Sequence, residues 1–257
     1  MTAVLVSTMK RTRTLSFNRS ERLNAVSVEL YQETFDALQQ ADADVEIRAI
    51  ILTGVGRSFC VGADLKAHKS GCRSPEERLH YAYLGQQVCA QIQTMNTPVI
   101  AAVHGYALGA GAEIAVSADF LIMAAEAKMG FPEVSIGTFV GGGVTNRLPR
   151  LVGLRRATEM LVLGERFTGS QAVEWGLAYQ AVPTDELLDS AGKLADCLAG
   201  KAPLALGRMK AALMRNDALD VVFKTEPEEL VALMDTRDWA EGVAAFAEQR
   251  TPIFEGK

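Results

Sequence analysis

The sequence predicts an α/β fold with a mainly parallel sheet at its core and a helical C-terminal region. Two observations carry this prediction. Nearly continuous apolar runs over residues 47–54, 98–103 and 120–124 are typical of strands covered on both faces, and helical patterns separate them. After about residue 144, almost every segment has helical periodicity. We therefore expect a core domain over residues 1–199 and a helical region over residues 200–257.

The first elements are predicted to be a hairpin and a helix. Polar and apolar residues alternate over residues 12–17, and residues 4–7 supply a partner strand. A helix then begins after Ser27 and ends near residues 42–44. Its apolar positions recur at steps of three and four and form one stripe, made by Val28, Tyr31, Phe35 and Leu38.

A second helix is predicted to begin at Pro75, because Ser74 can cap it and Glu77 completes a capping box. It ends near residue 95 and leads into the strand at 98–103. The segment HGYALGAGAE, residues 104–113, is expected to form a turn into another helix, and residues 120–124 form the next strand. Strands that alternate with helices favour right-handed crossovers and parallel pairing. Beyond residue 144, only residues 178–182 are predicted to be extended.

Composition and charge exclude several classes of protein. The 257 residues are 49% hydrophobic and 22% charged, which is ordinary for a globular chain. The net charge of -5 gives no basic footprint for a nucleic acid. The four cysteines form no CxxC pair and have no histidine at zinc spacing, so we predict free thiols in a reducing compartment and no metal site: Cys60, Cys72, Cys89 and Cys197.

No membrane-spanning segment is predicted. The chain between Arg78 and Glu113 lacks charged residues, but glutamines, Pro98 and His104 interrupt it too often for a span of about 20 apolar residues. The N-terminal MTAVLVSTMKRTR lacks the long apolar centre of a signal peptide. We therefore expect a cytoplasmic protein.

Three stretches have the composition of a reactive site. GRSFCVGADLK (56–66) places Gly62 and Ala63 after a strand, where backbone N–H groups can face a ligand oxygen. HGYALGAGAE opens a helix whose first turn offers further N–H donors. KMGFPEVSIGTFVGGGVTNRL (128–148) adds Glu133 and a run of three glycines. Each stretch alone has an ordinary explanation: a tight turn, a solvated carboxylate, a flexible joint.

Together, these stretches resemble the enoyl-CoA hydratase/isomerase family, also called the crotonase superfamily. The resemblance lies in FCVGADLK, PVIAAVHGYALGAGAEIAVSAD and GFPEVSIGTFVGGGVTNRLPRLVG, and extends to ERLNAVS, FTGSQAVEWGLAYQAVP and EGVAAFAEQRTPIF. It covers nearly the whole chain. The fold implied is the ClpP/crotonase type, a spiral of ββα units. The assembly implied is a homotrimer or a homohexamer made of two trimers, with residues 200–257 as a trimerisation or cover region.

The resemblance also implies roles for individual residues. The N–H groups of Ala63 and Ala110 match the oxyanion hole, Glu113 and Glu133 match the two hydratase carboxylates, and Gly141 matches the position that helps to hold the reacting water. The second oxyanion position is often glycine in this family, so the Ala110 methyl group leaves the donor intact and trims the space. Coenzyme A, which is part of the substrate, implies no separate cofactor. Its expected contacts are Arg22, Ala25, Val61, Ala63, Asp64, Leu65 and Lys66. Arg22 and Lys66 are equally well explained as ordinary surface charges.

Hydration of an enoyl-CoA thioester is the activity that the resemblance favours. Adding water needs one carboxyl group to take a proton and another to deliver one, and we expect the helix start to keep Glu113 charged as the base, with Glu133 as the acid. Isomerases manage with one carboxylate near Glu133, so a Δ-isomerase or another crotonase-type acyl-CoA lyase is the alternative. An idle acyl-CoA binder or an RNA-binding member is less favoured, because the helix ELYQETFDALQQADAD is acidic.

The acyl group of the substrate is left open by the sequence. Several aromatic side chains are core residues by default, and any one of them is also a candidate wall of the acyl pocket: Tyr81, Tyr83, Phe131, Phe139 and Trp175. The pattern does not distinguish short, aromatic and alicyclic acyl chains.

Overall fold

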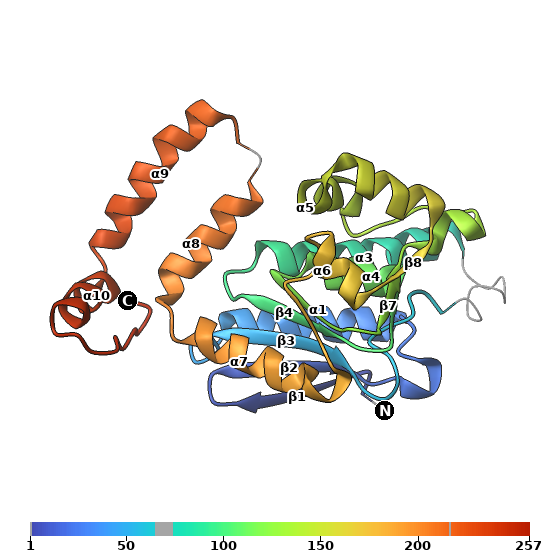
Figure 1. The fold of residues 1–257 in the computed structure, drawn as a ribbon, viewed down its shortest axis with the longest axis horizontal. Helices are drawn as coiled ribbons and strands as arrows, with labels where there is room; N and C mark the ends of the chain where they lie inside the picture. The colour runs from blue at the N-terminus through green and yellow to red at the C-terminus, as the bar shows by residue number, and fades with distance from the viewer. Residues whose placement is uncertain (1, 65–73, 216) are drawn as a thin grey trace.

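A six-stranded sheet forms the centre of the molecule (Figure 1). The computed structural model describes residues 2–64, 74–215 and 217–257. The strands, in spatial order, are β1 (Val4–Met9), β2 (Thr12–Phe17), β3 (Ala49–Gly54), β4 (Val99–Val103), β6 (Phe120–Ala124) and β9 (Gln180–Val182). Only β1 and β2 pair antiparallel, and every later neighbour is parallel. The predicted hairpin and the mainly parallel sheet are therefore confirmed.

Helices cover both faces of this sheet. One face packs against α1 (Val28–Ala43), α3 (Pro75–Thr94) and α4 (Ala110–Ser117), and the other against α7 (Leu187–Ala199). Within β3, Ile50 and Leu52 are buried in the first of these layers and Ile51 in the second. This alternation confirms that the apolar run at residues 47–54 is covered on both sides. The predicted start of α3 is also confirmed, because its capping box is formed.

A second sheet of three short strands was not predicted. It contains β5 (Tyr106–Leu108), β7 (Lys128–Gly130) and β8 (Arg166–Thr168). Each has three residues, which is too short for an alternating pattern to be recognised in the sequence. An isolated bridge between Cys60 and Ala107 joins this sheet to the segment after β3. The small sheet thus brings the first two glycine-containing stretches next to each other.

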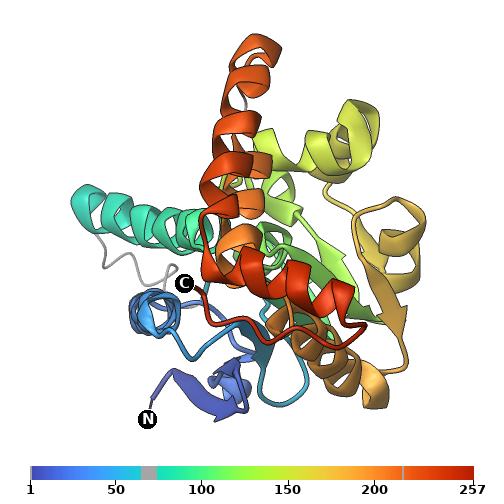
Figure 2. The same cartoon turned by 90° about the vertical axis from the view of Figure 1, so that its left-hand side faces the viewer.

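The second half of the chain is mostly helical, as predicted. Besides α7, its helices are α5 (Val144–Thr158), α6 (Gly169–Glu174), α8 (Pro203–Met214), α9 (Leu219–Met234) and α10 (Arg237–Ala247), with a π-helical turn at Glu159–Leu163 and 3-10 turns at Pro132–Ile136 and Thr184–Glu186. A further 3-10 turn, Ser20–Arg22, lies between β2 and α1. Among the helices, α9 was not identified individually from the sequence. Figures 1 and 2 both show α9 projecting beyond the body of the sheet. None of the described helices is long and apolar enough to span a membrane.

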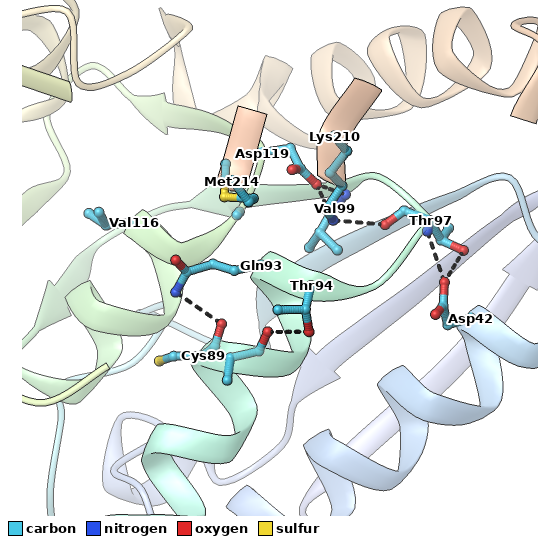
Figure 3. Close-up of polar contacts among 12 residues, drawn as sticks. Asp42, Cys89, Gln93, Thr94, Thr97, Val99, Val116, Asp119, Lys210 and Met214 are labelled. Atoms are coloured by element: carbon cyan, nitrogen blue, oxygen red, sulfur yellow. Dashed lines mark hydrogen bonds and ion pairs between the residues drawn. The ribbon is translucent and has the colours of Figure 1, made fainter. Parts of the chain in front are cut away.

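A buried ion pair fixes α8 to the edge of the core (Figure 3). Lys210 is 6% exposed, and its Nζ lies 2.7 Å from Asp119 Oδ2 and 3.1 Å from the Thr97 carbonyl oxygen. The same Asp119 oxygen accepts a hydrogen bond from the Val99 amide at 2.8 Å. Asp42 accepts from both the amide and the hydroxyl group of Thr97. Because a buried ammonium group must be paired, this network specifies where the C-terminal helices join the core.

Candidate active site

A cavity of about 490 Å³ lies where the turns after β3 and β5 meet α1, α3 and the glycine run. The five predicted catalytic residues line it, namely Ala63, Ala110, Glu113, Glu133 and Gly141. The rest of the described lining is Tyr31, Val61, Gly62, Tyr81, Ala82, Gly85, Gln86, Gly109, Pro132, Ile136, Thr138, Phe139, Val140 and Gly142. The three reactive-looking stretches of the sequence therefore converge on one hollow.

In the turn after β3, the Ala63 amide points away from the neighbouring segment that contains Val26. Val26 donates its N–H to the Gly62 carbonyl at 2.8 Å, and Asp64 donates its N–H to the Val26 carbonyl at 3.4 Å. In a parallel bridge of this kind, the residue between the two bonds points its own N–H the other way. Within the described part of the chain, the Ala63 amide has no hydrogen-bond acceptor.

The start of α4 presents a second amide beside the first. Ala110 is the first residue of α4, so its N–H has no intrahelical acceptor, and no other described residue accepts from it. Gly109 precedes it with φ of 52° and ψ of -124°. A Cβ atom on Gly62 would lie 3.4 Å from the Ala110 nitrogen and 2.6 Å from the Leu108 oxygen. The two turns thus approach so closely that only glycine fits at position 62.

Glu113 is a buried carboxyl group held by a backbone hydrogen bond. It lies in the first turn of α4, is 8% exposed, and its Oε1 accepts from the Gly141 N–H at 2.6 Å. Burial raises its pKa from 4.5 to about 7, the Gly141 hydrogen bond acts against this rise, and the charge of Glu133 adds to it. The sequence-based expectation that the helix start keeps Glu113 charged is therefore outweighed by burial.

Glu133 is the second buried carboxyl group. It lies in the 3-10 turn Pro132–Ile136, is 8% exposed, and its Oε2 has no hydrogen-bond partner among the described residues. Burial raises its pKa, and its own backbone N–H lowers it by less. Gly109 leaves room for this side chain, because a Cβ atom there would lie 2.7 Å from Glu133 Oε1. Glu133 is thus not a solvated surface carboxylate.

The glycine run packs directly against Glu113. A Cβ atom on Gly141 would lie 3.2 Å from Glu113 Oε2. Gly142 has φ of 60°, and a Cβ atom there would lie 2.8 Å from Cys89 Sγ and 3.0 Å from Glu113 Cβ. These contacts require small residues, so the run is more than a flexible joint. The Gly141 N–H, which the resemblance assigns to the reacting water, donates to Glu113 Oε1 in this structure.

The predicted coenzyme A contacts are only partly gathered at the cavity. Val61 and Ala63 line it, whereas Ala25 is buried nearby and Arg22 is exposed, and neither of these two belongs to the lining. Asp64 follows the lining residue Ala63. Leu65 and Lys66 lie outside the described residues.

Arg19 is a site-supporting residue that the sequence did not reveal. Its guanidinium donates to the Ala25 carbonyl oxygen and lies 3.3 Å from Asp64 Oδ2. It therefore ties the turn that presents Ala63 to the segment after β2. An arginine in a polar turn carries no sequence signal of its own, since such residues are mostly solvated.

Of the aromatic candidates for the acyl pocket, Tyr81 and Phe139 line the cavity. Phe131 is fully buried in the core, Trp175 packs on Phe167, and Tyr83 is 60% exposed outside the lining. The structure adds Tyr31, which the sequence placed only on the apolar stripe of its helix.

Comparison with known proteins identifies the family. Residues 11–257 match the model of the enoyl-CoA hydratase/isomerase family. The chain is 36% identical to 2,3-dehydroadipyl-CoA hydratase of Escherichia coli (strain K12), with 100% of both chains covered. It is 34% identical to 1,2-epoxyphenylacetyl-CoA isomerase of the same organism, again over 100% of both chains. The crystal structure of an enoyl-CoA hydratase from Bacillus anthracis superposes with a TM-score of 0.94 at 32% identity, covering 99% of this chain and 100% of that one.

Proposed function

Because the chain belongs to the enoyl-CoA hydratase/isomerase family and has its crotonase-like fold, we propose that it adds water across the 2,3-double bond of an enoyl-CoA thioester. The observation that carries this proposal is the convergence of two buried carboxyl groups and two acceptor-free amides on one cavity. The same arrangement argues against a member that only binds acyl-CoA, since buried carboxyl groups are costly unless they are used.

The two amides supply electrostatic stabilisation. When hydroxide from water adds to C3 of the thioester, negative charge moves onto the carbonyl oxygen. The N–H groups of Ala63 and Ala110 are fixed by the surrounding turns and need no reorganisation to donate to that oxygen. Removing one donor of this kind costs roughly 10²–10³ in rate in well-studied enzymes.

The two carboxyl groups divide the proton transfers. With a pKa of about 7, Glu113 is partly ionised near neutral pH and takes a proton from the attacking water. Glu133, whose pKa is also raised, delivers a proton to C2 and completes the 3-hydroxyacyl-CoA product. Because the two charges influence each other, the pair titrates with coupled pKa values. The Gly141 hydrogen bond holds Glu113 in the orientation that this step needs.

The alternative activity is double-bond isomerisation, because the family includes enoyl-CoA isomerases as well as hydratases. An isomerase needs a single carboxyl group to move a proton between two carbon atoms. The burial of both Glu113 and Glu133 at the same cavity favours hydration. Two substrates distinguish the activities: a hydratase converts a 2-enoyl-CoA into 3-hydroxyacyl-CoA, and an isomerase converts a 3-enoyl-CoA into 2-enoyl-CoA.

The test of the proposed function uses Glu113→Gln and Glu133→Gln in separate proteins with crotonyl-CoA. Either change removes one proton-transfer group, so kcat should fall by about 10²–10⁴ in each. Glu174→Gln, on the exposed end of α6, is the matched control and should retain wild-type turnover. Near-normal hydration by either cavity variant would contradict the paired role.

The position of the nucleotide and the assembly are further parts of the proposal. We place the coenzyme A moiety along the backbone near Ala25 and residues 61–66, with Arg22 or Lys66 as the candidate phosphate contact.

Exposed apolar residues on the C-terminal helices, such as Met209 and Leu213, are consistent with burial against other copies in a homotrimer or homohexamer. Sedimentation of the purified chain measures the number of copies directly.

A further inference from the structure

Tyr31 places an unpartnered hydroxyl group on the wall of the cavity. The residue lies on α1, is 4% exposed and packs its ring against Tyr81 of α3, with the ring centroids 5.3 Å apart. The Tyr81 hydroxyl donates to the Val26 carbonyl oxygen at 3.2 Å. The Tyr31 hydroxyl, by contrast, has no hydrogen-bond partner among the residues that the structure describes. Its oxygen is not one of the fully buried unpartnered atoms of the described residues, so it is accessible from the cavity and can bond a group that enters there.

Gly85 on α3 is matched to this hydroxyl group. A Cβ atom at position 85 would lie 2.7 Å from the Tyr31 hydroxyl oxygen and 2.9 Å from its Cζ atom. Glycine within a helix is destabilising relative to alanine, because it loses more backbone entropy on folding. The helix α3 therefore has a destabilising glycine at a position where a methyl group would displace the Tyr31 ring.

The charges around the cavity restrict what this hydroxyl can bind. Burial raises the Tyr31 pKa well above its usual range, and Tyr81 and Glu113 add to the rise, so the group is neutral throughout the working pH range. The ionisable carboxyl groups of the described lining are Glu113 and Glu133, and that lining contains no lysine or arginine. These two groups, when ionised, would repel a negatively charged acyl substituent but not an uncharged oxygen.

We propose that Tyr31 is a specificity-determining residue whose hydroxyl group hydrogen-bonds an uncharged oxygen, a hydroxyl or a carbonyl, on the acyl chain of the substrate. This inference rests on the proposed hydration and names the substrate class that the site prefers. The neighbouring Gln86 amide, which also lines the cavity, offers a second polar contact on the same wall. Ile136, Phe139 and Val140 provide an apolar lining for the hydrocarbon part of the chain.

The test compares unsubstituted and oxygenated substrates. Crotonyl-CoA and hex-2-enoyl-CoA are assayed beside derivatives that carry a hydroxyl or keto oxygen at C4, C5 or C6, and beside 5-carboxypent-2-enoyl-CoA. The wild-type chain should have a higher kcat/KM for at least one uncharged oxygenated substrate than for its parent. Tyr31→Phe should lower that ratio by about 2- to 12-fold, since one neutral hydrogen bond is worth roughly 0.5–1.5 kcal/mol.

Two further variants separate recognition from packing. Gly85→Ala keeps the hydroxyl group but displaces it, and should lower the ratio in the same direction. Tyr179→Phe removes the hydroxyl group of a tyrosine that is 59% exposed and outside the described lining, and should leave the ratio unchanged. An equal loss on all substrates in Tyr31→Phe, or a preference for the carboxylate substrate that Tyr31→Phe does not alter, would overturn the proposal.

A binding measurement keeps this inference separate from the proposed activity. Calorimetric titration with butanoyl-CoA, hexanoyl-CoA and their oxygenated derivatives requires no turnover. If no enoyl-CoA is hydrated, the proposed function fails, but a selective loss of affinity for an oxygenated chain in Tyr31→Phe still supports the hydrogen bond. If hydration occurs and all oxygenated chains bind no better than their parents, the inference about Tyr31 fails alone.

Discussion

The burial of Glu113 implies a stability cost that depends on pH. In the folded protein its pKa is about 7, against an ordinary value of 4.5 for an exposed glutamate. Each pH unit between the folded and unfolded pKa values is worth about 1.4 kcal/mol. The difference therefore corresponds to about 3 kcal/mol, an upper figure because Glu133 titrates together with Glu113.

The sign follows from which state binds the proton more tightly. Below pH 4.5 both states are protonated and the carboxyl group costs nothing. Between pH 4.5 and 7 the unfolded chain releases its proton first, so the free energy of unfolding falls as the pH rises. Above pH 7 the full cost is present. Glu113→Gln cannot ionise, and its amide oxygen can still accept from the Gly141 N–H, so this variant should gain up to about 3 kcal/mol over wild type at pH 8.

The assay is urea unfolding of both proteins at pH 5 and pH 8, with the hydration rate measured in parallel. We expect the stability difference to appear mainly at pH 8, in a variant that has lost activity. The wild-type kcat/KM should rise with pH up to about 7, as the base ionises. Glu174→Gln serves again as the exposed control. A stability difference that is the same at both pH values would refute the assignment of burial as the cause.

Two other substitutions test the geometry of the fold and the site. Gly109→Ala forces a side chain into a positive-φ position and within 2.7 Å of Glu133 Oε1, so we expect a loss of about 1–3 kcal/mol in unfolding free energy and a fall of about 10² in kcat. Gly137→Ala is also at positive φ but has no atom within 4 Å of the added carbon, so it should reduce stability without reducing kcat. Equal turnover in the two variants would contradict the role of the contact with Glu133. Lys210→Met leaves the buried Asp119 unpaired and should cost about 3 kcal/mol in urea unfolding. Lys10→Met, which breaks the exposed pair with Asp196, should cost under about 1 kcal/mol, and similar losses in both variants would show that the Lys210 pair does not anchor α8.

Long elements could be predicted from the sequence because each has a pattern of its own. The capping box at Ser74 and Glu77 and the continuous apolar run of β3 are local signals, and the structure confirms both. The strands β5, β7 and β8 have no such signal. They form because separate segments meet, and their pairing is a property of the whole fold.

Site residues could be predicted from the sequence where their role depends on residue type. Properties that depend on the surrounding structure could not be predicted. Gly62, Gly109 and Glu133 stood out as small or charged residues near strand ends, and the structure gathers them. The ionisation of Glu113 could not be inferred, because two opposing effects act on it. A helix start favours the charged form and burial opposes it, and only coordinates show that burial dominates.

Tyr31 illustrates why the acyl specificity cannot be predicted from sequence periodicity. The helical stripe of α1 marks Val28, Tyr31, Phe35 and Leu38 as inward-facing. Tyr31 and Leu38 are buried, and the other two are partly buried against the core. Periodicity, however, cannot say whether an inward-facing residue meets another side chain or a cavity. The difference is made by Gly85, more than fifty positions later in the chain, which leaves the space that the hydroxyl group occupies. If the Tyr31 hydroxyl group binds the acyl chain, the acyl specificity of relatives should vary with the residues at positions 31 and 85 taken together. Exchanging either residue alone leaves a clash or an empty space.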